Sequence, residues 1–234
     1  MSCCRPASPR PAIPVLLALI VGLAACGPRR LAVVGPAPDP AGTAAALERR
    51  TALQAPTRID FEWSYVETDM RSRGRGVARV EPPARARLDL FLGNGETILR
   101  AALVDDGYRL PPGTDDRMLP PPGLMWGALG VFRTDAAARL LGGDRLEGGA
   151  VRLRYGYPGG LELHYQVEGE ELVRVDLLEG DELRQWVTLV PDPAGPRPLE
   201  ARYRDQVEVR ELRLERTSVR PSDPFPAAIW DPGR

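Results

Sequence analysis

The chain has 234 residues, with 31 basic side chains, 32 acidic side chains and a net charge of −1. This balance argues against a nucleic-acid partner, which requires a clustered basic surface, and the length predicts one domain with a sizeable core. The cysteines are Cys3, Cys4 and Cys26. The rest of the chain is therefore expected to fold without a disulfide or a cysteine metal site.

The first 25 residues are built like a secretory signal. Arg5 and Arg10 give a basic start, and residues 12–24 are almost wholly apolar. This run is short for a membrane-spanning helix, which needs about 20 residues, and a plain signal peptide would end in an Ala-x-Ala-like site. Instead, Leu23-Ala24-Ala25-Cys26 resembles the lipobox of bacterial lipoproteins. That resemblance implies cleavage before Cys26 and its acylation, by palmitate or a similar chain. A plain secreted protein and an uncleaved anchor are the alternatives.

Residues 26–42 are rich in proline, glycine and alanine, and are expected to form a semi-extended tether. Residues 43–234 are expected to form the folded domain. Thr43 is a suitable N-cap for a helix over residues 44–53, which Pro56 would end.

From Ile59 onward, apolar and polar residues alternate with a period of two, which predicts strands with one face in water. Gly93-Asn94-Gly95 predicts a hairpin turn. About ten such strands joined by tight turns predict a mainly β fold, an antiparallel meander curved into an open half-barrel with short helices. The strands are expected at 59–65, 74–80, 86–92, 97–100, 151–157, 161–167, 173–177, 183–190, 199–203 and 207–214.

The last expected strand contains a conflict of parity. Val207 and Val209 share one face, whereas Leu212 and Leu214 share the other. One extra residue would restore the register, so the pattern predicts a β-bulge at Arg210-Glu211.

A proline-rich, acidic segment at 111–123 divides the meander. The following residues, 124–132, are apolar on nearly every side, which predicts a helix that is buried on more than one face. We expect it to cover the concave side of the sheet as a lid or a plug, approached closely through Gly74 and Gly76.

A second short helix is predicted over residues 135–141. Thr134 would be its N-cap, and Gly142 would end it.

No arrangement of residues predicts catalysis, a metal or a cofactor. His164 is the only histidine, and it shares a predicted polar strand face with Glu162 and Gln166, which is typical of a solvated side chain. There is no Gly-x-Ser-x-Gly elbow. The pairs Asp105-Asp106 and Asp115-Asp116 flank glycine or proline, so turn chemistry explains them better than calcium binding does.

A ladder of arginines alternates with the apolar face of two neighbouring strands. Its members are Arg73, Arg75, Arg79, Arg85 and Arg87. The main interpretation is a solvated outer surface of the sheet, and contact with anionic headgroups is the alternative.

Together, the lipobox, the short first helix and the two meanders separated by a proline-rich apolar insert resemble the LolA/LolB-like superfamily. Locally, residues 81–88 followed by Gly93-Asn94-Gly95-Glu96 resemble its LolB-like lipoproteins, and Asp106-Gly107-Tyr108 fits their next turn. The resemblance implies an open half-barrel, a helical lid and binding of lipid or lipoprotein acyl chains. The family's receptor carries a protruding loop with an exposed leucine, whereas the hairpin at 93–96 is tight and polar.

These observations predict a non-enzymatic lipoprotein that binds an acyl chain or another apolar ligand. The alternative is a structural, sensor or assembly subunit with a filled core and an envelope protein as its partner. A cavity among Trp63, Leu90, Trp126 and Trp186 would favour the first hypothesis, and tight packing would favour the second. Gly27 is not Asp, and by resemblance to enterobacterial lipoprotein sorting this implies the outer membrane with the domain in the periplasm, although the inner membrane and the cell surface stay open. The expected apolar ligand site comprises Trp63, Leu88, Leu90, Leu92, Leu124, Met125, Trp126, Leu129, Phe132 and Trp186.

Overall fold

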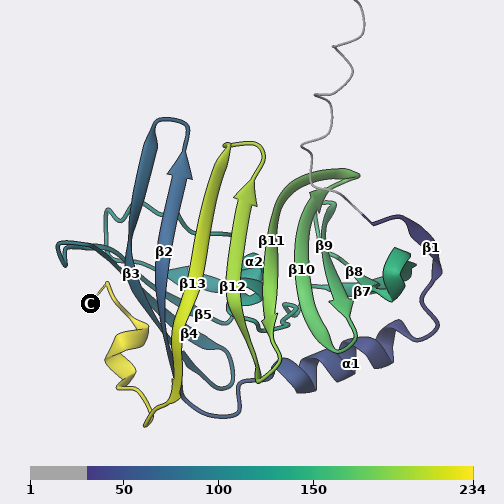
Figure 1. The fold of residues 1–234 in the computed structure, drawn as a ribbon, viewed down its shortest axis with the longest axis horizontal. Coiled ribbons are helices and arrows are strands. Elements are labelled where there is room, and N and C mark those ends of the chain that lie inside the picture. Colours follow the sequence, from purple (N-terminus) through teal and green to yellow (C-terminus); the bar gives the residue numbers. More distant parts are fainter. Residues whose placement is uncertain (1–30, 234) are drawn as a thin grey trace, which may run out of the picture. The chain divides into compact units, whose positions relative to one another are not determined.

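The computed structural model describes residues 31–233, so the predicted signal peptide and Cys26 lie outside the described residues. Over this range, thirteen strands form one antiparallel sheet in the order β1-β7-β8-β9-β10-β11-β12-β13-β2-β3-β4-β5-β6 (Figure 1). The strands are β1 (Val33–Pro36), β2 (Thr57–Glu67), β3 (Met70–Glu81), β4 (Arg85–Leu92), β5 (Thr97–Val104), β6 (Gly107–Arg109), β7 (Arg139–Leu146), β8 (Val151–Gly156), β9 (Leu161–Glu168), β10 (Glu171–Glu179), β11 (Glu182–Asp192), β12 (Gly195–Asp205) and β13 (Arg210–Pro221).

The sheet is an open half-barrel, because its two edge strands, β1 and β6, do not pair with each other. Strands β2 to β6 are neighbours in chain order, as are β7 to β13, and β13 pairs with β2 to join the two runs. The period-two alternation gives the sheet a concave apolar face and a convex polar face. Both the mainly β class and the open half-barrel are therefore confirmed.

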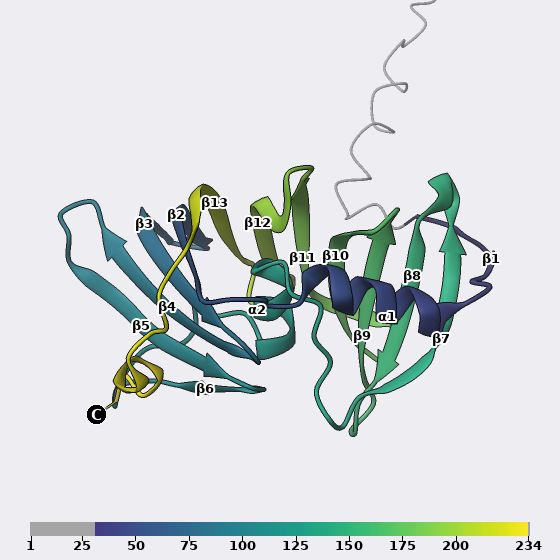
Figure 2. The same ribbon diagram turned by 90° about the horizontal axis from the view of Figure 1, so that it is seen from below.

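Two α-helices accompany the sheet, α1 (Pro40–Thr51) and α2 (Pro122–Ala128). Figure 2 shows α2 inside the curve of the sheet, while α1 runs beside the strands at the β7 end. Helix α1 contacts β7 and β12, whereas α2 contacts β10, β11 and β12. Within residues 31–233, no helix is both long enough and apolar enough to cross a membrane.

The first helix begins earlier than the sequence predicted. Asp39, not Thr43, is the N-cap, and its carboxylate accepts a 2.8 Å hydrogen bond from the backbone N–H of Gly42. Pro40 occupies the first turn, where its missing N–H costs nothing. Part of the expected tether is strand β1, which pairs with β7, so the compact unit starts at Ala32.

The helix predicted over 135–141 is wrong. Asp135 instead accepts a 2.8 Å hydrogen bond from the N–H of Ala137 in a local turn, and β7 starts at Arg139. A helix there would remove the pairs that Arg139 and Leu140 form with Gly156 and Tyr155 of β8, so strand pairing overrides the helix propensity of the alanines. Gly143 also allows the β1–α1 connection to pass close by, because a Cβ there would lie 3.1 Å from the Cβ of Ala37.

The β-bulge predicted at Arg210-Glu211 is also wrong. The ladder between β12 and β13 is regular from Asp205↔Arg210 onward. Val207 and Val209 belong to the hairpin turn between the strands, so their parity does not constrain β13. The irregularity in β13 lies further along, between Arg216 and Ser218, where it pairs with β2.

The end of the chain covers part of the outer face. The 3₁₀ turn η2 (Ala227–Trp230) contacts β4 and β5, and Trp230 is buried beneath the guanidinium of Arg85. Arg87 donates a 2.7 Å hydrogen bond to the carbonyl oxygen of Ile229 and forms a 2.9 Å ion pair with Asp89. This part of the arginine ladder is therefore covered and paired, which corrects the expectation of a wholly solvated surface. A second short 3₁₀ turn, η1 (Glu147–Gly149), links β7 to β8.

Candidate functional site

Helix α2 carries no polar side chain apart from the indole N–H of Trp126, and it lies against the concave face. Leu124 and Met125 are completely buried, and Trp126 is 1% exposed. The helix begins after Pro121 and stops before Gly130, which adopts a positive φ of 69°. The prediction of a buried helix on the concave face is thus correct, but the helix spans 122–128, and Val131 and Phe132 lie beyond its end.

Two glycines on one side of α2 bring it close to the sheet. A Cβ at Gly123 would lie 2.7 Å from Cδ1 of Leu163, and a Cβ at Gly127 would lie 2.8 Å from Cγ2 of Val175. Residues four apart share a helix face, so the missing side chains create the contact surface. The glycines expected to permit this approach behave differently, since a Cβ at Gly76 would instead meet the ring of Phe61 at 2.2 Å.

Hydrogen bonds fix the segments on the N-terminal side of α2. The indole N–H of Trp126 donates to the carbonyl of Asp105 at 2.9 Å, and the hydroxyl of Tyr108 donates to the carbonyl of Pro120 at 2.8 Å. Burial raises the pKa of Tyr108 well above its ordinary value, so this hydroxyl stays protonated as a donor. Helix α2 and the proline-rich entry to it are therefore each attached to the β5–β6 region by one hydrogen bond.

An aromatic cluster packs behind the helix. Phe132 makes an edge-to-face contact with Tyr165, with ring centroids 4.7 Å apart, and Tyr155 adjoins both rings. The hydroxyl of Tyr165 donates to the carbonyl of Arg133 at 2.7 Å, and burial raises its pKa well above the ordinary value. The chain after α2 is thus also held on the concave face.

A buried arginine joins the ends of both helices. Arg197 lies at the start of β12, and its guanidinium donates to the carbonyls of Gly130 at 2.8 Å and Thr51 at 3.0 Å. Burial lowers its pKa to about 10, so it remains charged at neutral pH. A cation at two helix C-termini is favourable, because the free carbonyls there carry partial negative charge.

Thr51 strengthens the same junction. Its hydroxyl donates to the carbonyl of Leu47 within α1 and accepts from the N–H of Phe132 at 3.0 Å. The ends of α1 and α2 are therefore connected by one arginine and one threonine.

Open space flanks α2 at both ends. At its N-terminal end lies a pocket of about 340 Å³, lined by Pro121, Pro122, Gly123, Trp126 and the apolar side chains of Leu161, Leu163 and Leu177, with Asp106, Arg133, Asp135 and Tyr157 also lining it. At its C-terminal end lies a space of about 30 Å³ beside Arg197, Leu129 and Phe61. The first is within the size range of ligand pockets, which are about 300–1,000 Å³, whereas the second is about the size of one water molecule.

The structure brings together nine of the ten residues expected at the apolar site. Trp63, Leu88, Leu90, Leu124, Met125, Trp126, Leu129 and Phe132 belong to one buried cluster, and Leu92 packs against it. Trp186 does not join them, because β11 directs Val187 and Leu189 into the core and Trp186 to the outer face, beneath the guanidinium of Arg174. The cavity expected among the three tryptophans and Leu90 is therefore not formed as named.

The polar candidates lie away from this site. His164 is buried on the outer face, 2.7 Å from a carboxylate oxygen of Glu162, so the expectation of a solvated histidine is wrong. Burial, opposed by Glu162, lowers its pKa. Asp105 and Asp106 both lie within 4 Å of Arg133, as turn residues. Between residues 31 and 233 there is no cluster of three or more His, Cys, Asp or Glu that could hold a metal ion.

Sequence reasoning missed Arg197 and the glycine pair Gly123 and Gly127. The glycines had a local signal, their spacing of four in an apolar segment. Arg197 carried only a weak one, since it lies between Pro196 and Pro198 in a segment that reads as a loop.

Comparisons with known proteins identify the fold. No protein-family model matches the chain, and no curated protein matches it. Among solved structures, a LolA superfamily protein of Nitrosomonas europaea, NE2245, superposes with a TM-score of 0.56 at 9% identity, covering 81% of this chain and 96% of that one. The chain has a LolA/LolB-like fold. A putative outer membrane lipoprotein-sorting domain of Vibrio parahaemolyticus gives a TM-score of 0.50 at 10% identity, covering 81% of this chain and 95% of that one.

Proposed function

We propose that this protein is a lipid-anchored envelope lipoprotein whose LolA/LolB-like half-barrel binds an acyl chain or a similar apolar ligand. The observation that carries the proposal is the pocket of about 340 Å³ at the N-terminal end of α2. Its floor is apolar, and the ion pair of Arg133 and Asp106 lies at its rim. Apolar pockets with a few polar groups are the usual form of a small-molecule site.

The ligand would lie between α2 and the ends of β9 and β10. Leu161 lines this pocket and is 39% exposed, while Leu163 belongs to the core. A chain entering past Leu161 would reach Trp126, whose indole is already fixed to Asp105. Further insertion requires α2 to move, because its central residues are fully packed.

The close packing of α2 supports a second candidate function. In that hypothesis, α2 is a permanent plug and the protein is a structural or sensor subunit without a ligand. Arg197 and Thr51, which fix the ends of both helices, favour it.

Binding of a fluorescent fatty acid tests the proposal. Leu161→Arg should weaken it at least tenfold by placing a charge in the apolar entry. Val190→Arg is the matched control, because Val190 is 48% exposed and faces the opposite side of the sheet. The tryptophan fluorescence of the protein should change on binding in the wild type and should not change in the Trp126→Phe variant.

The outcomes separate the two candidates. Saturable binding that Leu161→Arg alone weakens supports the carrier. If no acyl ligand binds and Trp126→Ala destabilises the fold by about 3–5 kcal/mol, the plug is structural and the carrier proposal fails.

A further inference from the structure

Most arginines on the convex face are neutralised by carboxylates. Arg79 pairs with Asp89 at 2.6 Å, Arg174 with Asp176 at 2.6 Å, and Arg152 with Asp144 at 2.6 Å. The same arrangement continues across β12 and β13, where Arg204 pairs with Glu211 at 2.6 Å. Most of the positive charge on this face is therefore neutralised by ion pairs.

The first half of β3 departs from this pattern. Arg71, Arg73 and Arg75 are exposed at alternate positions of one strand, and none has a carboxylate partner among the described residues. In the ladder with β2, Arg73 lies opposite Ser64 and Arg75 lies opposite Glu62. The ladder of arginines recognised in the sequence thus divides into a paired part and an unpaired part.

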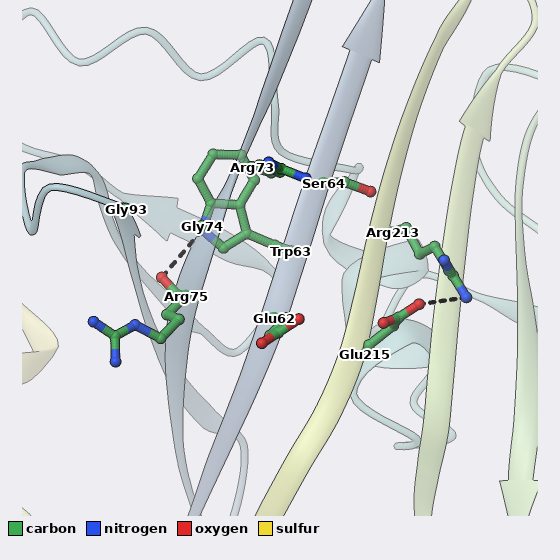
Figure 3. A pocket seen from close by; sticks show the side chains of 9 residues that line it. All are labelled: Glu62, Trp63, Ser64, Arg73, Gly74, Arg75, Gly93, Arg213 and Glu215. Atoms are coloured by element: carbon green, nitrogen blue, oxygen red, sulfur yellow. Dashed lines mark hydrogen bonds and ion pairs between the residues drawn. The ribbon is translucent and has the colours of Figure 1, made fainter.

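Two of these unpaired arginines, Arg73 and Arg75, border a hollow in the sheet surface. It has a volume of about 490 Å³, and Figure 3 shows the side chains around it. Arg73, Arg75 and Ser64 bring free donors, while Arg213 is paired with Glu200 and Glu215. The lining residues are Glu62, Trp63, Ser64, Arg73, Gly74, Arg75, Gly93, Arg213 and Glu215.

The backbone beneath the hollow is firmly held. The indole N–H of Trp63 donates to the carbonyl of Arg75 at 3.1 Å and to that of Phe91 at 3.3 Å, which ties β3 to β4. Gly74 allows this, because a Cβ there would lie 1.9 Å from the carbonyl oxygen of Phe91. A rigid backbone reduces the cost of placing Arg73 and Arg75 around a ligand.

We propose that this hollow binds a phosphate group, with Arg73 and Arg75 as its principal donors and the hydroxyl of Ser64 as a third. Since Arg213 is already paired with Glu200 and Glu215, the other charged residues that line the hollow are Arg73, Arg75 and Glu62, in which positive charge is in excess. Guanidinium groups match phosphate oxygens with two parallel hydrogen bonds, and such charge-assisted bonds are the strong ones. Glu62 lies beside Arg75 and opposes the anion. The site is independent of the acyl pocket, which lies on the other face.

Titration calorimetry with inorganic phosphate, on the full chain carrying Cys26→Ser, tests this site. Arg73→Gln with Arg75→Gln should weaken binding by about tenfold or more, since hydrogen bonds to charged groups are lost. Arg139→Gln with Arg145→Gln is the matched control, because both are exposed on one strand, β7, with no carboxylate partner among the described residues. Glu62→Gln should strengthen binding, a change in the opposite direction that loss of folding cannot imitate.

Vesicles distinguish the sources of the phosphate. Flotation of the protein with phosphatidylcholine vesicles that contain phosphatidylglycerol identifies a lipid headgroup. Binding of inorganic phosphate without flotation identifies a free phosphate compound. Either result supports the site if Arg73→Gln with Arg75→Gln abolishes it. Equal loss in the Arg139 and Arg145 control, or no saturable binding to either probe, overturns the proposal.

Discussion

The guanidinium of Arg197 lies 2.8 Å from the carbonyl oxygen of Gly130, at a position where the arginine is only 7% exposed. Among the described residues, its guanidinium donates to backbone carbonyls and to no carboxylate. The charge is thus offset by the ends of α1 and α2. Whatever displaces α2 must first break these bonds, so the residue couples the position of the helix to the stability of the fold.

Arg197→Met should lower the free energy of unfolding by about 3 kcal/mol. The substitution keeps an apolar stem of similar length but leaves the carbonyls of Gly130 and Thr51 without a buried donor. Urea denaturation measures the loss. Arg202→Met is a suitable control, because Arg202 is partly exposed in a surface ion pair and should change stability by less than about 1 kcal/mol. Equal stability of the two variants would contradict the role of Arg197.

Gly127→Ala should destabilise the protein by about 1–3 kcal/mol through overpacking, although alanine is the better helix former by about 1 kcal/mol. The new methyl group would lie 2.8 Å from Cγ2 of Val175. Thermal unfolding gives the sign. Gly107→Ala is the control, since a Cβ there meets nothing within 4 Å. A stabilised Gly127→Ala protein would show that α2 is free to lift from β10.

Asp205 should make the fold sensitive to acid. Burial opposes its charge, but backbone N–H groups of Glu208 and Val207 and the guanidinium of Arg210 outweigh burial and lower its pKa below the ordinary 3.8. The stabilisation is therefore present above pH 3.8 and lost as pH falls through the lower folded-state pKa. Asp205→Asn should lower stability at pH 7 and reduce the further loss on acidification.

The measurement is urea denaturation at pH 7 and at about pH 2.5, below the ordinary aspartate pKa. Asp115→Asn provides the comparison, because Asp115 is exposed and solvent weakens its ion pair with Arg117. If both variants respond to pH like the wild type, Asp205 does not carry the acid sensitivity.

Cys26→Ser should release the protein from membranes into the soluble fraction. Each buried methylene adds about 0.8 kcal/mol of membrane affinity, so two or more acyl chains anchor a protein stably. Fractionation and mass spectrometry of the intact protein check the result. An unlipidated wild type, together with a variant that still sediments with membranes, would exclude acylation at this cysteine.

The alternation of residues predicted the sheet well, because a wet face and a buried face leave a direct signal in β2, β4, β8 and β9. It failed where both faces carry apolar residues. In β11, Trp186 alternates with Val187 and Leu189, and bulk gave no indication that the tryptophan packs outward beneath Arg174. The segment at 135–141 failed for a different reason, since Arg139 and Leu140 belong to β7 and pair with β8, which outweighs the helix propensity of the alanines before them.

The sequence predicted the buried helix of the candidate site but not the residues that hold the end of that helix in place. The apolar character of residues 124–132 was sufficient to place a buried helix against the sheet. The role of Arg197 depends on carbonyls of Thr51 and Gly130, which lie 146 and 67 residues away in the chain. No local pattern encodes such a contact, because an arginine between two prolines is equally compatible with a solvated loop.

The pairing of β13 with β2, from Glu211↔Val66 to Pro221↔Thr57, places the seam of the sheet between an early strand and the final one. Until β13 has been synthesised, β2 and β12 are both open edges, and strands with open edges readily pair with other chains. Contacts between such distant segments also slow folding. We therefore expect the nascent chain to depend on protection from aggregation, and a chain truncated before Arg210 to accumulate as two unjoined sheets.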